Sequence, residues 1–346
     1  MAGTEATTLL LSTQSQRPCF YSSSVSKNKN LVNSFSGDEG ESCYVLPNPV
    51  IDYSMLISGD VLKRTKAISD LNEACLNFGF FTVTNHGIPD SLMGSVMNWL
   101  SKFFYQNDEE KRRYETNDSK DKIRFRWGGR TQRELLHMRA HPTFHCPTKP
   151  ANSTRVLQEY CEKMREMGVQ LLRGISKSLG LEEDYIEKKM NLESGYNVFG
   201  PNYYPALSHS SDDKNQIGQF PHRDPGLLVL LAQDVDGGLQ IEHQKKWFNA
   251  NFPPSSIFVI VADHIEILTN GKYKSLLHRV ALTNEVERKS LPFFFGPSLE
   301  ATVRPAPEFV DEHNPPFYRE MTYKDYLESN KHHVIEARAN LNQIRI

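Results

Sequence analysis

Residues Pro221–Ala232 read PHRDPGLLVLLA, and the apolar run that ends them, Leu227–Ala232, indicates the kind of fold. Six apolar residues are the length of a buried strand, whereas a helix that crosses a bilayer needs roughly 20. A second run of the same length covers Ile257–Ala262. From Gly195 to about Val310, short runs rich in Val, Ile, Leu, Phe and Tyr alternate with Gly, Pro, Asn and Asp turns. This spacing is typical of a β-sandwich or jelly roll.

Helical patterns lie on both sides of this β region. Apolar residues recur near helical spacing from Leu62 to Phe78, and Asp90 is placed to cap a second helix with one apolar face. We also expect strands at Val50–Asp52 and Gly79–Thr84, a long irregular connection over 107–155, and helices at Val156–Leu179, Glu182–Met190 and Tyr323–Leu327. The sequence therefore predicts a mainly β protein with flanking helices wrapped around one antiparallel core.

Composition divides the chain into four segments. Residues 1–42 are rich in Ser, Thr and Asn with little apolar periodicity, so we expect a disordered tail. Residues 43–190 are expected to form an N-terminal helical region, and residues 191–310 the β core that carries the chemistry. Residues 311–346 are expected to form a C-terminal helical segment that packs on this core.

Charge and cysteine content exclude several functions. The 346 residues carry 40 Lys and Arg against 42 Asp and Glu, a net charge of -2. No excess positive charge is available for a nucleic-acid backbone or an anionic membrane, so we expect neither partner. The five cysteines are widely spaced without a Cys-x-x-Cys pair, which favours a reducing compartment over a disulfide framework or a zinc site. We expect a cytoplasmic protein, with a plastid transit peptide in the Ser-rich N-terminal segment as the alternative.

His222 and Asp224 indicate the chemistry. Residues i and i+2 of an extended segment point to the same side, so an imidazole and a carboxylate can reach one point. His278 follows a strand-like stretch, Tyr273–Leu277, and can reach the same point from a neighbouring strand. Two histidines and one carboxylate, with coordination positions left open, match the facial triad of non-haem Fe(II) oxygenases. Taken singly, His222 could instead be a hydrogen-bonded loop histidine, and His278 a surface residue of a strand.

The triplet His222-Arg223-Asp224 also matches the His-Arg-Asp of a protein-kinase catalytic loop. That interpretation fails because Val229 stands where the loop's metal-binding asparagine is required. The chain also has no Asp-Phe-Gly and no glycine-rich phosphate loop. Strand alternation directs Arg223 away from the two candidate ligands and toward solvent.

Arg288 and Ser290, ten and twelve residues after His278, make the metal interpretation stronger. Strand alternation puts Arg288, Ser290, Pro292 and Phe294 on one face, where a guanidinium and a hydroxyl share an interior surface. A buried arginine needs an anion, and a ligand carboxylate would take a bidentate bond from the guanidinium and a further bond from the hydroxyl. A second alternating pair, Asn202 and Tyr204, precedes the metal motif; an ordinary β-edge is the alternative for this pair.

These motifs, in this order, resemble the plant soluble 2-oxoglutarate/Fe(II)-dependent dioxygenases. The resemblance covers about residues 44–346 and includes Pro49-Val50-Ile51-Asp52, Asn85-His86-Gly87 and Asn202-Tyr203-Tyr204-Pro205. His141-Pro142, Gly296-Pro297-Ser298 and Pro305-Ala306-Pro307-Glu308 make it most similar to the branch of flavanone 3-dioxygenase-like and downy-mildew-resistance-type oxygenases.

The resemblance implies a double-stranded β-helix, a cupin-like jelly roll, that holds Fe(II) through His222, Asp224 and His278. It implies that 2-oxoglutarate chelates the iron and that its distal carboxylate pairs with Arg288 and Ser290, and the site residues Asn202 and Tyr204 are implied to help hold it. The implied activity is oxidation, by default hydroxylation, of a small plant specialised metabolite such as a flavonoid, phenolic or alkaloid. O2 is consumed, 2-oxoglutarate is decarboxylated to succinate, and ascorbate is the implied reductant.

Phenylalanines are the candidates for the substrate pocket. By alternation Phe294 joins the Arg288 face and contacts the substrate, while its two neighbours enter the core. Phe199 and Phe125 are further candidates for the pocket wall. Besides the small molecules, we expect no partner, and we expect a monomer.

Two functions from other classes compete with the dioxygenase. A non-catalytic cupin-like protein that binds a small molecule would show damage at one metal ligand or at Arg288, and none is visible. A zinc hydrolase would use the same triad but would leave Arg288 and Ser290 without a role.

Overall fold

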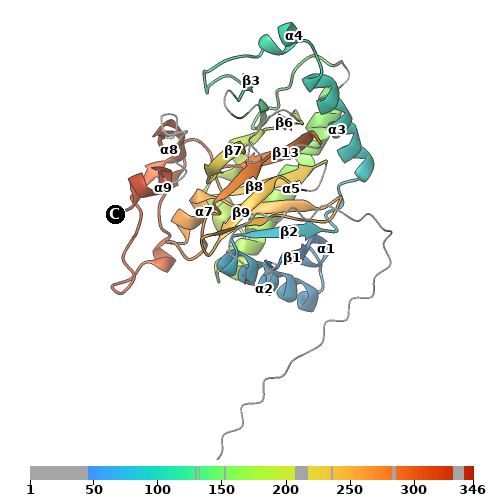
Figure 1. The fold of residues 1–346 in the computed structure, drawn as a ribbon. Helices are drawn as coiled ribbons and strands as arrows, with labels where there is room; N and C mark the ends of the chain where they lie inside the picture. The colour runs from blue at the N-terminus through green and yellow to red at the C-terminus, as the bar shows by residue number, and fades with distance from the viewer. Residues whose placement is uncertain are drawn as a thin grey trace, which may run out of the picture. The chain divides into compact units, whose positions relative to one another are not determined.

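The computed structural model describes residues 46–128, 131, 133–151, 153–206, 217–234, 237–282, 286–329 and 339–346. The expected tail, 1–42, lies outside these described residues. In chain order the described elements (Figure 1) are β1 (Val50–Asp52), α1 (Tyr53–Leu56), α2 (Val61–Asn77), β2 (Phe80–Thr84), α3 (Asp90–Phe104), α4 (Asp108–Arg112), β3 (Ile123–Trp127), β4 (Glu134–His141), α5 (Thr154–Ser178), α6 (Tyr185–Lys189), the 3-10 helix η2 (Leu192–Ser194), β5 (Asn197–Phe199), β6 (Asn202–Tyr204), β7 (Ile217–His222), β8 (Leu228–Gln233), β9 (Leu239–His243), β10 (Lys246–Asn249), β11 (Ile257–Val261), α7 (Asp263–Leu268), β12 (His278–Ala281), β13 (Arg288–Phe295), β14 (Thr302–Val303), the 3-10 helix η3 (Pro307–Phe309), β15 (Met321–Thr322), α8 (Tyr323–Ser329) and α9 (Ala339–Ile344).

Two sheets form the centre of the described chain. The larger sheet has nine strands in the order β1-β2-β11-β8-β13-β5-β4-β3, and β6 pairs with both β13 and β4. The smaller sheet has four strands in the order β10-β9-β12-β7. Strand β1 is parallel to β2, and the other strand pairs among the described residues are antiparallel. The prediction of a mainly β protein with flanking helices is confirmed.

Strand β8 explains why the run Leu227–Ala232 is continuously apolar: both of its faces are buried. Leu228 and Leu230 belong to the large core that the helices share, whereas Val229 and Leu231 belong to a smaller apolar cluster. That cluster also contains apolar residues of β9 from the smaller sheet, so the two sheets pack face to face across it. The result is the jelly-roll arrangement that the sequence predicted.

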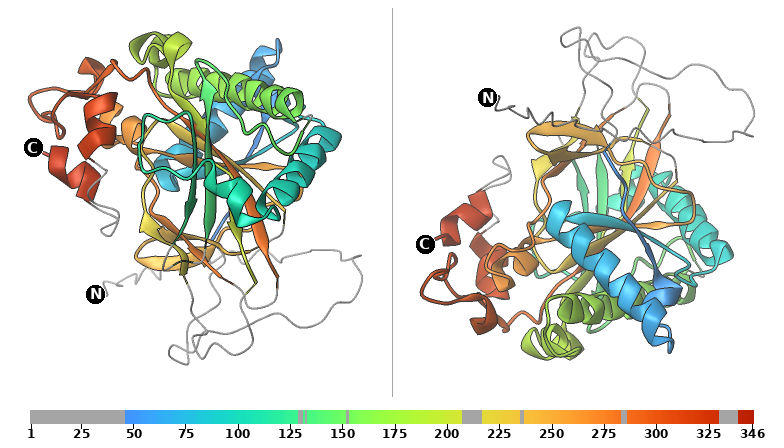
Figure 2. Two further views of the ribbon diagram at one scale, coloured as in Figure 1. Left: turned by 90° about the horizontal axis from the view of Figure 1, so that it is seen from above. Right: turned by 90° about the horizontal axis from the view of Figure 1, so that it is seen from below.

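Helices α2, α3 and α5 cover the other face of the nine-stranded sheet, as the views in Figure 2 show. Gly168 lets α5 lie directly on β13, because a Cβ at this position would stand 2.5 Å from the ring of Phe295. The helix ends as predicted at Gly180, whose φ of +78° suits glycine, and the N–H of Leu181 closes the turn on the carbonyl of Ser176 at 3.0 Å. The packing of α5 at Gly168 supports β13, the strand that carries Arg288.

The connection over 107–155 is more regular than the sequence indicated. It contains α4 and the hairpin of β3 and β4, which pairs with β5 and β6 in the large sheet. The prediction of an irregular loop was wrong because it followed the overall polarity and the prolines of this segment, although the apolar and polar residues of β3 and β4 alternate as a half-buried strand requires. Asp90 is also not a cap: the cap position is Pro89, Asp90 is the first helical residue, and no side-chain bond closes this end.

The segment between β11 and β12 also differs from the prediction. Helix α7 was not expected, because all six of its residues are buried and it shows no polar face. Tyr273–Leu277 was expected to be a strand, but β12 begins only at His278. The backbone there bonds to side chains of α7 and the turn that follows it: the N–H of Ser275 donates to Glu266 Oε2 at 2.7 Å, and that of Tyr273 donates to Thr269 Oγ1 at 3.1 Å.

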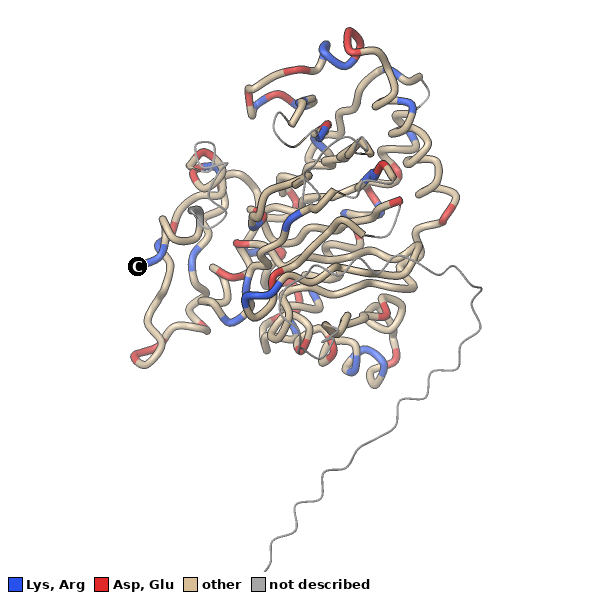
Figure 3. The backbone as a smooth tube through the Cα atoms, in the orientation of Figure 1, with Lys and Arg blue, Asp and Glu red and all other residues tan. Residues whose placement is uncertain are grey.

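Charged residues lie mainly on the helices and loops, and few lie on the central strands (Figure 3). Among the helices that the structure describes, none is both long and apolar enough to span a bilayer. A charged side chain that points from a central strand into the protein is therefore unusual, because such groups are seldom buried without a partner.

Candidate active site

Two histidines and a carboxylate meet at one end of the smaller sheet. His222 ends β7 and His278 begins β12, and the two are direct partners in the antiparallel ladder. Asp224 follows two residues after β7; its Oδ1 lies 3.6 Å from His222 Nε2 and its Oδ2 lies 3.3 Å from His278 Nε2. All three ligand atoms lie within 4.8 Å of one another. The prediction that these side chains reach one point is confirmed.

Backbone carbonyls orient both imidazoles. His222 Nδ1 lies 2.8 Å from the carbonyl oxygen of Phe220, and His278 Nδ1 lies 3.2 Å from that of Leu276. A carbonyl oxygen only accepts, so each Nδ1 donates its hydrogen to the backbone, and Nε2 is the nitrogen that each ring turns toward Asp224. This is the tautomer that a metal ligand requires.

Burial shapes the protonation of the cluster. The pKa of His222 lies well below its usual value because the ring is buried and because His278 lies beside it. Burial raises the pKa of Asp224, which is only 5% exposed. Two imidazole nitrogens and a buried carboxylate at one point fit a divalent transition metal, which would offset the cost of burying the carboxylate.

A second polar group lies on the larger sheet, where β13 pairs with β6. Arg288 is the register partner of Tyr204, and Ser290 is the partner of Asn202. The Arg288 side chain lies over the Tyr204 ring, 5.2 Å from its centre, and Asn202 Nδ2 donates to Ser290 Oγ at 3.4 Å. The prediction that Arg288, Ser290, Pro292 and Phe294 share one face is confirmed, because all four line one pocket, and Asn202 and Tyr204 line it as well.

The guanidinium of Arg288 is buried and incompletely bonded. Its Nη2 donates to Gln233 Oε1 at 2.9 Å, whereas Nε and Nη1 have no partner. No carboxylate among the described residues lies within ion-pair distance of it, and burial lowers the pKa of the side chain. A buried cation with two free N–H groups is a binding site for an anion.

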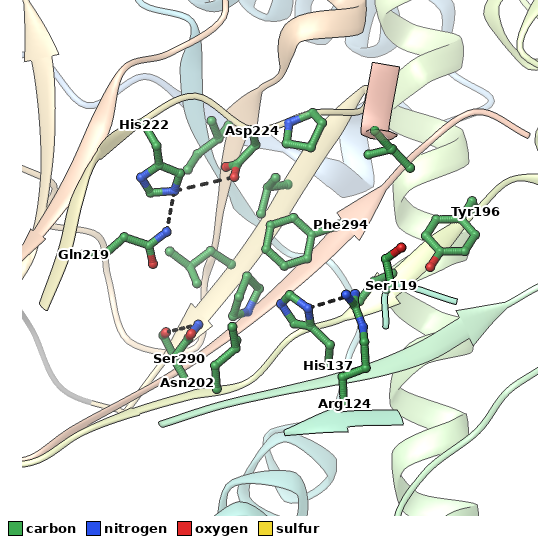
Figure 4. A pocket seen from close by; sticks show the side chains of 18 of the residues that line it. Ser119, Arg124, His137, Tyr196, Asn202, Gln219, His222, Asp224, Ser290 and Phe294 are labelled. Atoms are coloured by element: carbon green, nitrogen blue, oxygen red, sulfur yellow. Dashed lines mark hydrogen bonds and ion pairs between the residues drawn. The ribbon is translucent and has the colours of Figure 1, made fainter. Parts of the chain in front are cut away.

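Both groups open into one pocket of about 650 Å³. Figure 4 shows His222 and Asp224 on one side of Phe294, with Asn202 and Ser290 below them. Apolar side chains from both sheets complete the wall: Leu135, Val198, Val229, Leu231, Leu239, Ile260 and Val280. The pocket can therefore hold a metal, an anionic ligand and an apolar molecule side by side.

One wall of this pocket was not predicted. Strand β4 and the residue before it turn Arg133, Leu135, His137 and Arg139 into the pocket, and Arg124 of β3 joins them from the position opposite His137. The sequence signal was the alternation of these residues with Leu136 and Met138, which are buried in the core. The polar composition of residues 107–155 as a whole concealed this alternation.

Three of the phenylalanine predictions can be compared with the structure. Phe294 lines the pocket as expected. Phe199 and Phe125 do not: both are fully buried, Phe199 beside Tyr160 of α5, and Phe125 between Phe103 and Trp127. Alternation is the reason, because the neighbours Val198 and Arg124 are the residues of β5 and β3 that face the pocket.

Arg223 also departs from the prediction. It does not line the pocket, as expected, but it does not point freely into solvent. The side chain is half-buried, its Nη1 is buried without a hydrogen-bond partner, and its charge acts on the buried Asp263. Arg223 thus packs behind the metal-binding loop.

Comparison with protein families identifies two matching regions. Residues 197–297 match the 2OG-Fe(II) oxygenase superfamily, and residues 49–164 match the N-terminal domain described as non-haem dioxygenase in morphine synthesis. The first match contains the His222, Asp224, His278 cluster together with Arg288 and Ser290.

Individual proteins are similar over most of their length. The chain is 37% identical to 2-oxoglutarate-dependent dioxygenase 19 of Oryza sativa subsp. japonica over 86% of this chain and 90% of the relative. It is 32% identical to flavanone 3-dioxygenase 2 of the same rice over 80% of this chain and 82% of the relative. The crystal structure of JOX2 in complex with 2OG, Fe and JA superposes with a TM-score of 0.76 at 28% identity, covering 86% of this chain and 89% of that one.

Proposed function

The chain belongs to the 2OG-Fe(II) oxygenase superfamily, and on that premise we propose that it hydroxylates a small specialised metabolite of plants. It is a 2-oxoglutarate/Fe(II)-dependent dioxygenase, an oxidoreductase. The observation that carries the proposal is the pairing, within one pocket, of a His-Asp-His cluster with a buried arginine that lacks an anion.

We assign Fe(II) to His222, Asp224 and His278. Their Nε2 atoms and carboxylate oxygens converge from two strands and one loop, and backbone carbonyls keep both rings turned toward that point. With 2-oxoglutarate and O2, Fe(II) bound there supplies the oxidising chemistry of this superfamily. The role of the chain is to hold the reactants in place and to exclude water.

We assign the distal carboxylate of 2-oxoglutarate to Arg288 and Ser290. The free Nε and Nη1 of Arg288 can donate to it, and the Ser290 hydroxyl can add a third bond. Asn202 bonds to Ser290, and the Tyr204 ring lies against the guanidinium, so both support this geometry. The overall reaction balances as 2-oxoglutarate, O2 and R–H giving succinate, CO2 and R–OH.

The substrate is assigned to the space beside Phe294. Apolar residues of both sheets line that space, which suits the ring system of a flavonoid, a phenolic or an alkaloid. The similarity to a flavanone 3-dioxygenase supports this class of substrate, and hydroxylation is the default outcome.

Other properties follow as proposals. Ascorbate serves as reductant, and the chain acts as a monomer. A cytoplasmic location agrees with the three described cysteines, Cys75, Cys146 and Cys161, which are free thiols. We propose that the four segments of the chain meet near residues 42, 190 and 310. Strands of the second and third segments nonetheless belong to one sheet.

The test is succinate formation by the purified protein with Fe(II), ascorbate and 2-oxoglutarate. A mixed panel of flavanones, phenolic acids and alkaloids is added, and the products are analysed by mass. We expect one class of compound to stimulate succinate formation and to gain one oxygen atom. Absence of succinate, together with absence of the visible absorbance band of the Fe(II)–2-oxoglutarate chelate without O2, would favour a non-catalytic binding protein.

A further inference from the structure

The pocket contains more positive charge than Fe(II) and 2-oxoglutarate require. Two of its lining residues are acidic, Asp224 and the exposed Glu328. The lining residues that carry a positive charge are Lys120, Arg124, Arg133, Arg139, Arg288 and Lys324. With Fe(II) and dianionic 2-oxoglutarate in place, the iron, Asp224, Arg288 and the cosubstrate carry no net charge together. The positive charges of Arg124, Arg133 and Arg139, on or next to β3 and β4, therefore have no compensating negative charge in the pocket.

These arginines lack acidic partners within the chain. No ion pair to a carboxylate of the described residues is formed by Arg124, Arg133 or Arg139. Arg124 Nη2 instead contacts His137 Nδ1 at 3.2 Å, and Arg139 Nη2 donates to the Tyr196 hydroxyl at 3.4 Å. Clustered like charges without partners cost free energy in a pocket, unless a ligand supplies the missing negative charge.

Free hydrogen-bonding groups point to the same conclusion. The Nε atoms of Arg133 and Arg139 are buried and have no partner. Arg133 bonds through Nη1 to Gln219, which in turn contacts the metal ligand His222, so Arg133 lies on the side of the metal. Arg124, His137 and Arg139 form the part of the wall that is left for another ligand.

Phe294 links this group to the reaction centre. Its ring packs edge-on against His137, with 5.9 Å between ring centres. Figure 4 shows the ring between His222 and Asp224 on one side and Arg124 and His137 on the other. A substrate whose apolar part lies on Phe294 can thus reach the metal cluster with one end and the arginines with the other.

We propose that the substrate is a small molecule with an apolar body and an oxyanion group, and that Arg124 and Arg139 bind this group beside His137. This inference rests on the proposed function, because it takes Arg288 as the partner of 2-oxoglutarate. The oxyanion is a carboxylate, or a phosphate ester with the same acceptor chemistry. Neutral ring systems without such a group leave the arginines unpaired and bind weakly.

The test is calorimetric binding to the protein loaded with Fe(II) and 2-oxoglutarate without O2. The probes are cinnamate, decanoate and naphthoate, each with its methyl ester, and naphthyl phosphate. We expect at least one anion to bind about 10-fold or more tightly than its neutral ester, the range for a hydrogen bond to a charged group. The relative affinities of naphthoate and naphthyl phosphate distinguish a carboxylate site from a phosphate site.

Two variants locate the effect. Arg124→Gln reduces the preference for the anion over its ester by about 10-fold or more. The matched control is Arg126→Gln on the same strand: Arg126 is exposed, does not line the pocket and donates to the carbonyls of Thr116 and Asn117. This control retains the preference of the unaltered protein. Arg139→Gln replaces the first variant if Arg124→Gln does not fold.

Three results would overturn the inference. They are esters that bind as tightly as the anions, no binding by any anion of the panel, and equal behaviour of Arg124→Gln and Arg126→Gln. The absorbance band of the Fe(II)–2-oxoglutarate chelate is recorded first on the same sample. A missing band would refute the proposed function, whereas a normal band with no preference for anions would refute this inference alone.

Discussion

Arg288 on β13 and Arg124 on β3 both turn toward one pocket, but they belong to different walls. Arg288 is buried beside Ser290, Asn202 and Tyr204, a small group with two free N–H donors for a single ligand. Arg124 stands among other arginines and a histidine, with apolar side chains around them. On the assignments proposed above, the wall that contains Arg288, the first wall, binds the cosubstrate, and the wall that contains Arg124, the second wall, determines which molecule is oxidised.

The largest effect is expected from the loss of the metal ligand Asp224, which should abolish oxidation but leave the arginines that bind the two reactants in place. Asp224→Ala leaves both groups of arginines intact but removes the only carboxylate of the metal cluster. Since loss of residues that merely orient metal ligands costs about 10- to 100-fold, we expect more than about 100-fold loss of substrate-dependent succinate formation. The control is Asp70→Ala on the exposed face of α2, where Asp70 pairs with Lys66. Wild-type turnover by Asp224→Ala would contradict the metal assignment.

The next prediction concerns a change in the wall that contains Arg288 and leaves the wall that contains Arg124 unaltered. Arg288→Gln removes the cation assigned to 2-oxoglutarate, so the KM for 2-oxoglutarate is expected to rise about 10- to 100-fold. The KM for the oxidised substrate should change far less, because that molecule contacts the other wall. Steady-state kinetics with each reactant varied in turn measure both values. Equal increases in both KM values would show that the two walls do not act separately.

The sequence revealed the first wall and not the second, for a physical reason. Arg288 lies on β13, a buried strand rich in apolar residues, so the alternation that directs its side chain could be read directly, and His222 and Asp224 were found from their spacing of two residues. Arg124 and His137 lie on strands whose apolar and polar residues alternate, but the polar composition and the prolines of residues 107–155 outweighed this signal in our prediction. Helix α7 was missed for the opposite reason, since it is buried on every side.

Phe294 lies where the two walls meet, and its replacement sharpens the comparison. Phe294→Ala removes the ring that contacts His137, while Arg288 and Ser290 on the same strand remain. Loss of one aromatic contact predicts a rise of about 3- to 10-fold in the KM for the substrate. The KM for 2-oxoglutarate serves as the internal control. A larger effect on 2-oxoglutarate than on the substrate would place Phe294 at the wrong end of the pocket.

The smallest expected effect concerns pH. The pKa of His137 lies well below its usual value because the ring is buried and because the positive charges of Arg124, Arg133 and Arg126 act on it. A histidine with a lowered pKa stays neutral as the pH falls through its usual value, so His137 adds no charge for an anion. The Kd of the bound anion, measured by calorimetry, should therefore change by less than about two-fold between pH 8 and pH 6.5. Marked tightening as the pH falls would mean that His137, and not the arginines, supplies the charge.

The most direct test of the two separate walls is titration of the Fe(II)-loaded protein with 2-oxoglutarate in the absence of O2. The visible band of the chelate is followed in the unaltered protein, in Arg288→Gln and in Arg124→Gln. We predict that the band forms in the unaltered protein, that Arg288→Gln requires about 10-fold or more 2-oxoglutarate, and that Arg124→Gln stays within about two-fold. Absence of the band in the unaltered protein, or equal weakening by both variants, would contradict this account.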